Sequence, residues 1–330
     1  MIWIKTEEEN KIVTNFYLEI IGQAFKQLNQ EVFYSSNISE ISPNSGDIVV
    51  VSTSTSARKF MRRDIKLIYW AQGAWPEESY LRHKSKMRFA VTSWVEKTTL
   101  KRADFVFFVS DSMREHFRKK YKLDFDNYYI MPCANECFHE NSFDTPDKYQ
   151  NNVFCYAGAT SLWQCFEETI ELYSRIEREF PESKLLLLVK DRELAINLLT
   201  KYGVKNYEID FVSINQLPDR LSNVKYGFIL RKPSVINTVA TPTKTLTYLS
   251  NGIIPIYSEC LVGISEILKS SVYKVEIREG KELKSVINSV VKSVDKEKIL
   301  DDYKNIYKNY YDKEMHIERI SDTFKKIGVI

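Results

Sequence analysis

Residues Ala240–Ile256 read "ATPTKTLTYLSNGIIPI": a polar cluster of Thr, Pro and Lys, then an amphipathic stretch, Asn-Gly and an apolar run. Thr241 is predicted to be the N-cap of a short helix, with Pro242 at its first position, where a missing N–H costs no hydrogen bond. Asn251 and Gly252 tolerate the left-handed backbone that often ends a helix. The pattern therefore predicts a short helix that is followed directly by a strand.

The start of this helix is a candidate phosphate site. It offers free backbone N–H groups and the positive end of the helix dipole, to which Thr243 adds a hydroxyl and Lys244 a charge. Arg231 and Lys232 follow the apolar run "YGFIL" upstream, and Asn237 lies between. Ligands of open α/β sheets sit beyond the carboxyl ends of strands, so we expect these cations to converge on a diphosphate. A well-capped surface helix with solvated lysines is the alternative interpretation of the Thr-Pro-Thr-Lys cluster.

The rest of the chain alternates short apolar runs with helical patterns. The predicted strands are 2–4, 31–34, 47–51, 66–70, 104–109, 128–131, 153–156, 184–189, 207–211, 226–230, 253–257 and 272–277. The predicted helices are 11–29, 77–101, 112–120, 163–179, 192–201, 216–221, 242–250 and 263–269, and residues 281–330 are expected to be helical throughout. Strands alternating with helices predict an α/β protein with parallel sheets covered on both faces.

The totals fit a globular protein with two domains. The chain has 330 residues, 44% of them hydrophobic and 28% charged, and the polar segment 135–152 is interpreted as a linker between two α/β units. Its five cysteines have irregular spacing, which favours reduced thiols in a cytoplasmic protein. The first residues do not resemble a signal peptide, and apolar runs of about five residues are too short to cross a bilayer.

Positive charge is concentrated in one part of the chain. Residues 58–122 contain 17 Lys and Arg against 7 Asp and Glu, whereas residues 1–57 contain 3 Lys against 7 acidic residues. The cluster of Lys and Arg in Arg58–Lys66 and Arg82–Arg88 favours docking on an anionic membrane, at the inner face of the plasma membrane; a solvated basic face is the alternative interpretation. Because no known nucleic-acid module accompanies the charge, no nucleic-acid partner is expected.

Several segments, taken in order, resemble family 4-like glycosyltransferases with the GT-B fold, in a bacterial surface-polysaccharide branch. The segment "VKYGFILRKPSVINTVATPTKTLTYLSNGIIPI" resembles the donor-binding region of that family. "LKRADFVFFVSDSMREHFRKKY" and "YYIMPCANECF" resemble its first domain, and "FCYAGATSLWQCFEETIELYSRI" and "INQLPDRLSNVKYGF" resemble its second. The resemblance covers about residues 66–256.

The resemblance implies two Rossmann-like domains that face each other across a cleft. Residues 1–140 would form the acceptor domain, completed by a C-terminal helix at about 303–330, and residues 152–302 would form the donor domain. The implied activity is metal-independent, retaining transfer of a sugar from a nucleotide-diphosphate donor to a glycan or polyprenyl-linked acceptor. No cofactor or metal is expected beyond the donor itself.

The resemblance also assigns roles to individual residues. Arg231 and Lys244 would neutralise the leaving diphosphate and so act as the catalytic residues. The donor-binding set would be Gly158, Ala159, Thr160, Ser161, Lys190, Lys232, Asn237, Thr241, Pro242, Thr243 and Thr247. Two departures stand out: the family's ribose-binding glutamate is Thr247 here, and the glycine loop "GATSLWQC" lacks the family's Arg and Lys-Gly. They motivate an alternative, a non-catalytic relative that binds glycan or scaffolds a partner.

The loop "YWAQGAWPEESY" at residues 69–80 is the candidate acceptor site. Gln72, Gly73, Trp75, Glu77 and Glu78 combine aromatic faces that stack on sugars with groups that bind hydroxyls. A helix start, with proline at its first position and acids in its first turn, is the alternative interpretation. Glu96 is expected to serve ordinary packing, and the four histidines lack metal-binding spacing.

Overall fold

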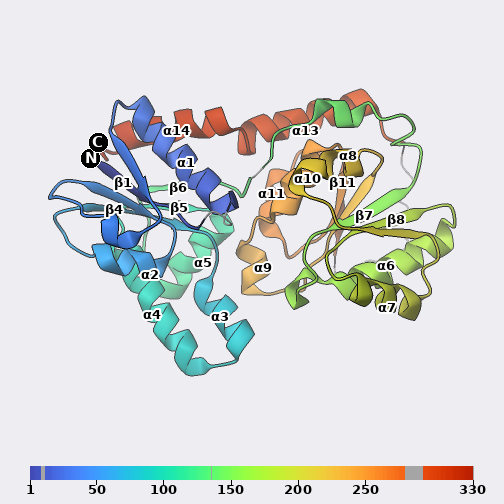
Figure 1. The fold of residues 1–330 in the computed structure, drawn as a ribbon, viewed down its shortest axis with the longest axis horizontal. Helices are drawn as coiled ribbons and strands as arrows, with labels where there is room; N and C mark the ends of the chain where they lie inside the picture. Colours follow the sequence, from blue (N-terminus) through green and yellow to red (C-terminus); the bar gives the residue numbers. More distant parts are fainter. Residues whose placement is uncertain (9–11, 135, 279–292, 330) are drawn as a thin grey trace. The chain divides into compact units, whose positions relative to one another are not determined.

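The computed structural model describes residues 1–8, 12–134, 136–278 and 293–329 (Figure 1). Contacts divide the chain into two units. The first unit comprises Met1–Asn135, Thr238–Thr241 and Tyr310–Ile330, and the second comprises Glu136–Asn237 and Pro242–Asn309. Each unit contains a six-stranded parallel sheet with helices, as the alternation of apolar runs predicted. The helix expected to complete the first unit from about residue 303 lies in the second unit as far as Asn309.

The sheet of the first unit has the order β2-β1-β3-β4-β5-β6, with every neighbouring pair parallel. Its strands are β1 (Ile2–Lys5), β2 (Val32–Ser35), β3 (Ile48–Val51), β4 (Lys66–Ala71), β5 (Phe105–Phe108) and β6 (Tyr128–Ile130). The residues of β3 and β5 are all buried. Strands covered on both faces have continuous apolar sequences, which is why these strands could be predicted from the sequence.

Helices cover both faces of this sheet. They are α1 (Ile12–Gln27), α2 (Ser54–Ala57), α3 (Trp75–His83), α4 (Lys86–Arg102), α5 (Asp111–Tyr121) and α14 (Lys313–Lys326), with short 3-10 turns η1 (Ile38–Glu40) and η2 (Arg58–Phe60). In Figure 1, α14 runs alongside α1, and Phe25 of α1 stacks on Phe324 of α14 with ring centroids 4.7 Å apart. The last helix therefore closes over the sheet formed by the first residues of the chain.

The single helix predicted for residues 77–101 is wrong, because the segment forms two helices, α3 and α4. Lys84 takes a left-handed conformation with φ of 52° and ends α3. Ser85 then caps α4 by accepting a hydrogen bond from the N–H of Arg88 at 3.3 Å. Neither residue is a glycine or proline, so the sequence carried no strong break signal.

The sheet of the second unit has the order β12-β11-β10-β7-β8-β9, again all parallel. Its strands are β7 (Val153–Ala157), β8 (Lys184–Leu188), β9 (Tyr207–Asp210), β10 (Tyr226–Ile229), β11 (Ile254–Ser258) and β12 (Val275–Ile277). The remaining helices are α6 (Phe166–Glu179), α7 (Arg192–Tyr202), α8 (Leu217–Leu221), α9 (Val235–Val239), α10 (Thr243–Ser250), α11 (Val262–Ile267) and α13 (Lys296–Tyr310), with the 3-10 turns η3 (Glu140–Phe143), η4 (Leu162–Gln164) and η5 (Ile214–Gln216). All the predicted strands are present in the two sheets.

Two predictions about the connecting segments need correction. The linker expected at 135–152 is, from Glu136 onward, part of the second unit, and Lys148 donates to the carbonyls of Ser142 and Asn251 at 2.9 and 2.6 Å. The tail is not one helical run, because Asp312 caps α14 anew by accepting from the N–H of Met315. Residues 279–292, also predicted to be largely helical, lie outside the described residues.

Gly227 in the centre of β10 leads to a stability prediction. A Cβ there would lie 2.5–2.7 Å from ring atoms of Tyr248, which is fully buried beneath the strand. Overpacking a core of this kind costs roughly 1–3 kcal/mol, so Gly227→Ala should lower the free energy of unfolding of the second unit by that amount. Chemical denaturation followed by circular dichroism measures it. Unchanged stability would show that the strand and the tyrosine can separate freely.

Candidate functional site

Three chain segments meet at the carboxyl edge of the second sheet. Strand β10 ends at Ile229, and Arg231 follows two residues later, while α10 places Lys244 in its first turn. Strand β7 pairs with β10 and leads into Gly158, whose φ is 130°. A Cβ on Gly158 would lie 2.8 Å from Cε of Lys244, so the lack of a side chain there lets the lysine pass close to the loop.

Arg231 and Lys244 converge on one neutral oxygen. Oε1 of Gln164, at the end of η4, accepts hydrogen bonds from Nη2 of Arg231 at 2.5 Å and from Nζ of Lys244 at 3.1 Å. Nη1 of Arg231 also donates to the backbone carbonyls of Gln164 and Leu230 at 3.2 and 2.7 Å. Nζ of Lys244 lies 3.8 Å from the centre of the Tyr156 ring. Within the described residues, neither cation is paired with a carboxylate.

The electrostatics of this pair favour an added anion. Burial lowers the pKa of Lys244 well below its ordinary value, and the nearby positive charge of Arg231 lowers it further. Burial also lowers the pKa of the Arg231 guanidinium. Each shift means that the charged form is poorly solvated where it sits, so a dianion placed between the two groups would stabilise both. The arrangement is therefore suited to bind a diphosphate.

The predicted capping of α10 is wrong. The residue at the N-cap is Pro242, which makes no side-chain cap, and the helix begins at Thr243. Oγ1 of Thr241 instead accepts the N–H of Cys133 at 3.0 Å, and both residues belong to the first unit. Thr243 and Lys244 remain in the first turn, where backbone N–H groups lack helical partners.

The other donor-site candidates surround this centre in different ways. Gly158, Ala159, Thr160 and Ser161 form the loop between β7 and η4. Lys232 is exposed and forms an ion pair with Glu168, and Asn237 donates to the carbonyl of Lys232 at 2.8 Å, which holds the loop after β10. Lys190 is exposed two residues after β8 ends. Thr247 is buried within α10, one turn after Lys244.

Gln164 and Tyr156 were not identified from the sequence. Gln164 lies between apolar residues in "SLWQCF", and its partners Arg231 and Lys244 are 67 and 80 positions away. Tyr156 belongs to the predicted buried strand 153–156, and nothing in the sequence distinguishes it from the other residues of that strand. Only the pairing of β7 with β10 brings these residues to the two cations, and no local pattern encodes that pairing.

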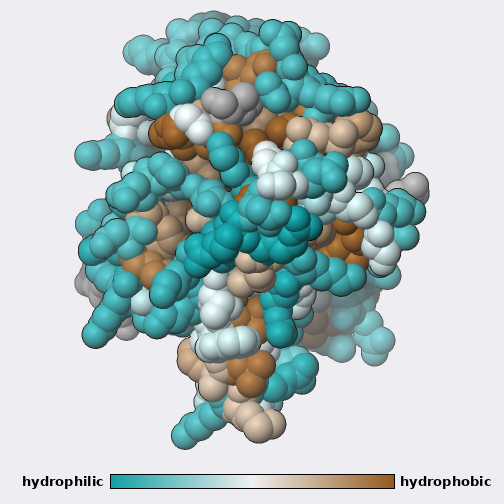
Figure 2. Space-filling model, turned by 90° about the vertical axis from the view of Figure 1, so that its left-hand side faces the viewer, coloured by the Kyte–Doolittle hydropathy of each residue, from teal (hydrophilic) through white to brown (hydrophobic). Residues whose placement is uncertain are grey.

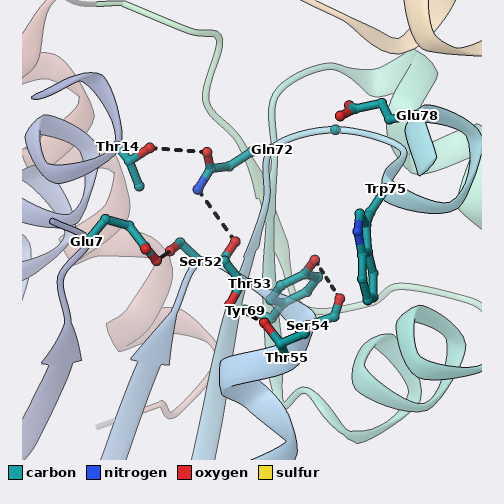
Figure 3. A pocket seen from close by; sticks show the side chains of 11 residues that line it. Glu7, Thr14, Ser52, Thr53, Ser54, Thr55, Tyr69, Gln72, Trp75 and Glu78 are labelled. Atoms are coloured by element: carbon teal, nitrogen blue, oxygen red, sulfur yellow. Dashed lines mark hydrogen bonds between the residues drawn. The ribbon is translucent and has the colours of Figure 1, made fainter. Parts of the chain in front are cut away.

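The first unit contains a separate polar cavity of about 540 Å³ (Figure 3). It lies at the carboxyl edge of that sheet, where loops follow β1, β3 and β4. Its lining residues are Glu7, Thr14, Ser52, Thr53, Ser54, Thr55, Tyr69, Gln72, Gly73, Trp75 and Glu78. Hydroxyl and carboxylate groups dominate this set, and no described lining residue is a lysine or arginine.

Hydrogen bonds order one wall of this cavity, and Trp75 lies on the opposite side (Figure 3). Gln72 accepts from Thr14 at 3.3 Å and donates to the carbonyl of Ser52 at 3.4 Å. The hydroxyl of Ser52 in turn donates to Glu7 at 2.6 Å. Burial raises the pKa of the Glu78 carboxyl on the far side of the loop. A polar wall facing an aromatic ring is an arrangement that binds sugars.

The structure divides the candidate acceptor residues into two groups. Gln72, Gly73, Trp75 and Glu78 line the cavity, but Glu77 does not. Glu77 faces α5, where Lys120 and His116 lie 2.8 and 3.3 Å from its carboxylate. Although burial opposes it, these hydrogen bonds lower the pKa of Glu77.

Several lining residues were missed, although one signal was available. Ser52–Thr55 belong to "STSTS", a hydroxyl-rich run directly after the predicted strand 47–51. Hydroxyl groups at the end of a buried parallel strand are well placed for ligand binding. Glu7 and Thr14 carried no comparable signal, whereas Tyr69 is the first residue of the loop predicted as the acceptor site.

Glu96 of α4 is fully buried, in agreement with its predicted packing role, and it leads to a pH prediction. Burial raises its pKa to about 7, although Tyr121 donates to it at 2.6 Å and Lys120 lies 3.5 Å away. A carboxyl with a raised pKa in the folded state contributes stability that is full below its unfolded pKa and is lost as pH rises through 7.

Between pH 4.5 and 8 the free energy of unfolding of the wild-type protein should therefore fall by up to roughly 3 kcal/mol more than that of Glu96→Gln. The measurement is the difference in unfolding free energy between the two proteins at several pH values. Glu318→Gln, at an exposed position of α14 in the same unit, is the control for changing one glutamate to glutamine. Parallel pH profiles for wild type and Glu96→Gln would contradict the prediction.

Comparison with known proteins agrees with this architecture. A glycosyltransferase from Rickettsia africae ESF-5 superposes with a TM-score of 0.65 at 11% identity, covering 99% of this chain and 98% of that one. Anabaena HepE in complex with UDP-glucose gives 0.66 at 12% identity, with 98% and 99% covered. S. aureus TarM, in complex with Fondaparinux, alpha-GlcNAc-glycerol and UDP, gives 0.58 at 8%, with 84% of this chain and 55% of that chain covered.

The shared fold defines the class: the chain has the GT-B fold, with two Rossmann-like units. Residues 32–134 match the family described as Glycosyltransferase Family 4. No curated protein matches the chain by sequence. The chain spans about half the length of the TarM chains it resembles.

Two features are absent from the described residues. None of their helices combines the length and apolar character that crossing a membrane requires. The same residues contain no group of three or more His, Cys, Asp or Glu side chains placed to hold a metal ion.

Proposed function

We propose that this protein is a glycosyltransferase that moves a sugar from a nucleoside-diphosphate donor to a glycan or lipid-linked acceptor. The observation that carries the proposal is the convergence of Arg231 and Lys244 on a single neutral oxygen of Gln164. Two cations held together without a carboxylate bind a diphosphate more strongly than two solvated side chains would. The match of residues 32–134 and the UDP and UDP-glucose complexes of fold relatives support the same class.

In this proposal the two cations act on the leaving group. As the bond from the sugar to the diphosphate breaks, negative charge grows on the phosphate oxygens, and Arg231 and Lys244 stabilise it without a metal ion. When the donor binds, its phosphate oxygens replace Oε1 of Gln164 as the acceptors of the hydrogen bonds from Arg231 and Lys244. The backbone of Gly158–Ser161 and the first turn of α10 add N–H donors. The configuration at the sugar would be retained, as in the family that the sequence resembles.

The remaining donor contacts are weaker. Thr247 offers a single neutral hydroxyl, worth about 1 kcal/mol net, where a glutamate would accept from two ribose hydroxyls. Lys190 and Lys232 add exposed positive charge near the same edge of the sheet, and Asn237 orders the loop that carries Lys232. Thr241 and Pro242 set the entry of the chain into α10 rather than touching the donor.

The cavity of the first unit is the proposed acceptor site. Its hydroxyl and carboxylate lining suits an uncharged sugar with several hydroxyl groups, and Trp75 offers a stacking face. The acceptor would be the sugar end of a glycan or lipid-linked chain, in the synthesis of a cell-surface polysaccharide at the cytoplasmic side of the membrane.

Trp75→Ala tests the acceptor assignment. Loss of the stacking surface should raise the KM for acceptor by roughly tenfold, the equivalent of about 1.4 kcal/mol, and should leave the Kd for nucleoside diphosphate unchanged. Steady-state kinetics and calorimetry measure the two quantities. The control is Trp163→Ala, in η4 of the second unit. It should not show this combination of a raised acceptor KM and an unchanged nucleoside-diphosphate Kd. An unaltered acceptor KM in Trp75→Ala would remove the cavity from the proposal.

The direct test of the function combines a binding screen with a transfer assay. A panel of nucleotide sugars is screened for thermal stabilisation, and the stabilising donors are then incubated with glycan acceptors and analysed by mass spectrometry. At least one donor should stabilise the protein and be consumed. No stabilisation by any nucleotide would refute the proposal, whereas glycan binding without sugar transfer would favour the alternative of a non-catalytic glycan-binding protein, which the threonine at position 247 motivates.

A further inference from the structure

Helix α4 exposes an apolar stripe on the surface of the first unit. Met87, Val91 and Trp94 are 76%, 56% and 59% exposed. They are spaced i, i+4 and i+7, so they lie along one face of the helix. The buried residues Thr92, Glu96 and Leu100 lie on the opposite side of the helix. The helix therefore has two separate faces, and only one of them is used by the fold.

The surroundings of this stripe are positively charged. With about 100° of rotation per residue, Lys86 and Arg88 fall on opposite sides of the line from Met87 to Trp94. The guanidinium of Arg58, from η2, lies 5.9 Å from the centre of the Trp94 ring. Lys59, Lys84, Lys97 and Lys101 are also exposed on η2 and around α4. Residues 79–95 contain four Lys and Arg and no Asp or Glu.

The same feature is visible on the molecular surface. In Figure 2, apolar residues coloured tan and brown are exposed at the bottom of the view, over the end of the first unit formed by α3 and α4. Hydrophilic residues border them. On α3, Tyr80 and Leu81 are exposed as well, which extends the apolar surface beyond α4.

We propose that the face formed by Met87, Val91 and Trp94, with its basic border, docks on an anionic phospholipid bilayer. An exposed apolar stripe between Lys and Arg side chains is the pattern by which a helix lies in a membrane interface, with its apolar side chains among the acyl chains and its cations on the headgroups. A tryptophan at such a boundary places its ring at headgroup level. An anionic bilayer repels acidic side chains, whereas a protein partner can accommodate them. The absence of Asp and Glu from residues 79–95 therefore favours the bilayer.

This inference goes beyond the proposed function and does not rest on it, because vesicle binding needs neither donor nor acceptor. It would hold the first unit, and with it the candidate acceptor cavity, at a lipid surface. If the chain binds vesicles but transfers no sugar, the docking face stands and the glycosyltransferase proposal fails. If it transfers sugar but does not bind vesicles, the glycosyltransferase proposal stands and the docking face fails.

The test uses the full chain and two kinds of vesicle, one of phosphatidylcholine alone and one with an equal part of phosphatidylglycerol. Sedimentation with the anionic vesicles should exceed sedimentation with the neutral ones at least tenfold, and it should weaken as salt is added. Trp94 emission should shift to shorter wavelength and be quenched by brominated acyl chains. Trp94→Phe should abolish that shift while binding is largely retained.

A triple variant, Met87→Ser, Val91→Ser and Trp94→Ser, should lose at least tenfold in vesicle binding. These side chains are exposed, so its thermal unfolding should match the wild type. Val272→Ser is the control for replacing an exposed apolar side chain outside the stripe, because Val272 is 81% exposed in the second unit. Equal vesicle binding by wild type and triple variant would overturn the proposal. So would a wild-type dimer that the triple variant converts to monomer, because the stripe would then cover a second copy of the chain.

Discussion

Replacing Lys244 with methionine is expected to lower kcat for sugar transfer by about 10²–10³-fold, the usual effect of removing one group that stabilises transition-state charge. Methionine keeps much of the apolar stem that lies beside Gly158 and over Tyr156 but removes the cation that faces Gln164. Affinity for a nucleoside diphosphate should fall as well, by about tenfold or more, because one charge-assisted contact is lost.

The same variant should unfold at a higher temperature than the wild type. Burial and Arg231 lower the pKa of Lys244 in the folded state, so this ionisable group costs stability at every pH below its unfolded pKa, and most at a pH below its folded pKa. Loss of function together with a gain in stability is the signature of a residue kept for its chemistry. An unrelated structural lysine would show the opposite stability change.

Lys201→Met is the matched control for Lys244→Met. Lys201 is an exposed lysine of the same unit, at the end of α7, and its ion pair is with Glu167. This variant should retain wild-type kcat, diphosphate affinity and melting temperature within error. If Lys244→Met also retains its diphosphate affinity, the cation pair is not the binding site.

Gly158→Ala is expected to weaken nucleoside-diphosphate binding by roughly tenfold or more, although it removes no polar group. Its φ of 130° is rarely adopted by residues with a side chain. The added Cβ would also lie 2.8 Å from Cε of Lys244, so the lysine must shift away from Gln164. A shift of this kind misplaces the ammonium group relative to the phosphates.

A double-mutant cycle separates this explanation from general damage to the loop. In the Lys244→Met background, Gly158→Ala should cost much less diphosphate affinity than it does in the wild type, because the ammonium that it displaces is already absent. Calorimetric titration of all four proteins with one nucleoside diphosphate gives the coupling. Additive effects would show that the loop conformation, and not the position of Lys244, determines binding.

The sequence predicted the two sheets well because parallel strands buried on both faces leave short apolar runs that few other structures produce. It also placed Arg231 and Lys244 correctly at a strand end and a helix start. The prediction failed where a helix ends through a backbone conformation that no glycine or proline indicates. Lys84 ends α3 in a left-handed conformation, and no glycine announced that break.

The sites show the same division between local and long-range information. The loop at 72–78 and the first turn of α10 could be predicted as candidate sites because each is compact in sequence. Gln164 was not found, because its importance comes from contacts to residues 67 and 80 positions away. Thr241 was given a capping role by local pattern, whereas the structure uses its hydroxyl to accept the N–H of Cys133.

The most direct test of the central claim is a crystal structure of the chain with UDP, used as the probe because fold relatives bind it. The account predicts phosphate oxygens within hydrogen-bonding distance of both Lys244 Nζ and the Arg231 guanidinium, with the Gln164 carboxamide moved off the two cations. A diphosphate bound elsewhere on the second unit, with Gln164 still joined to both cations, would contradict it.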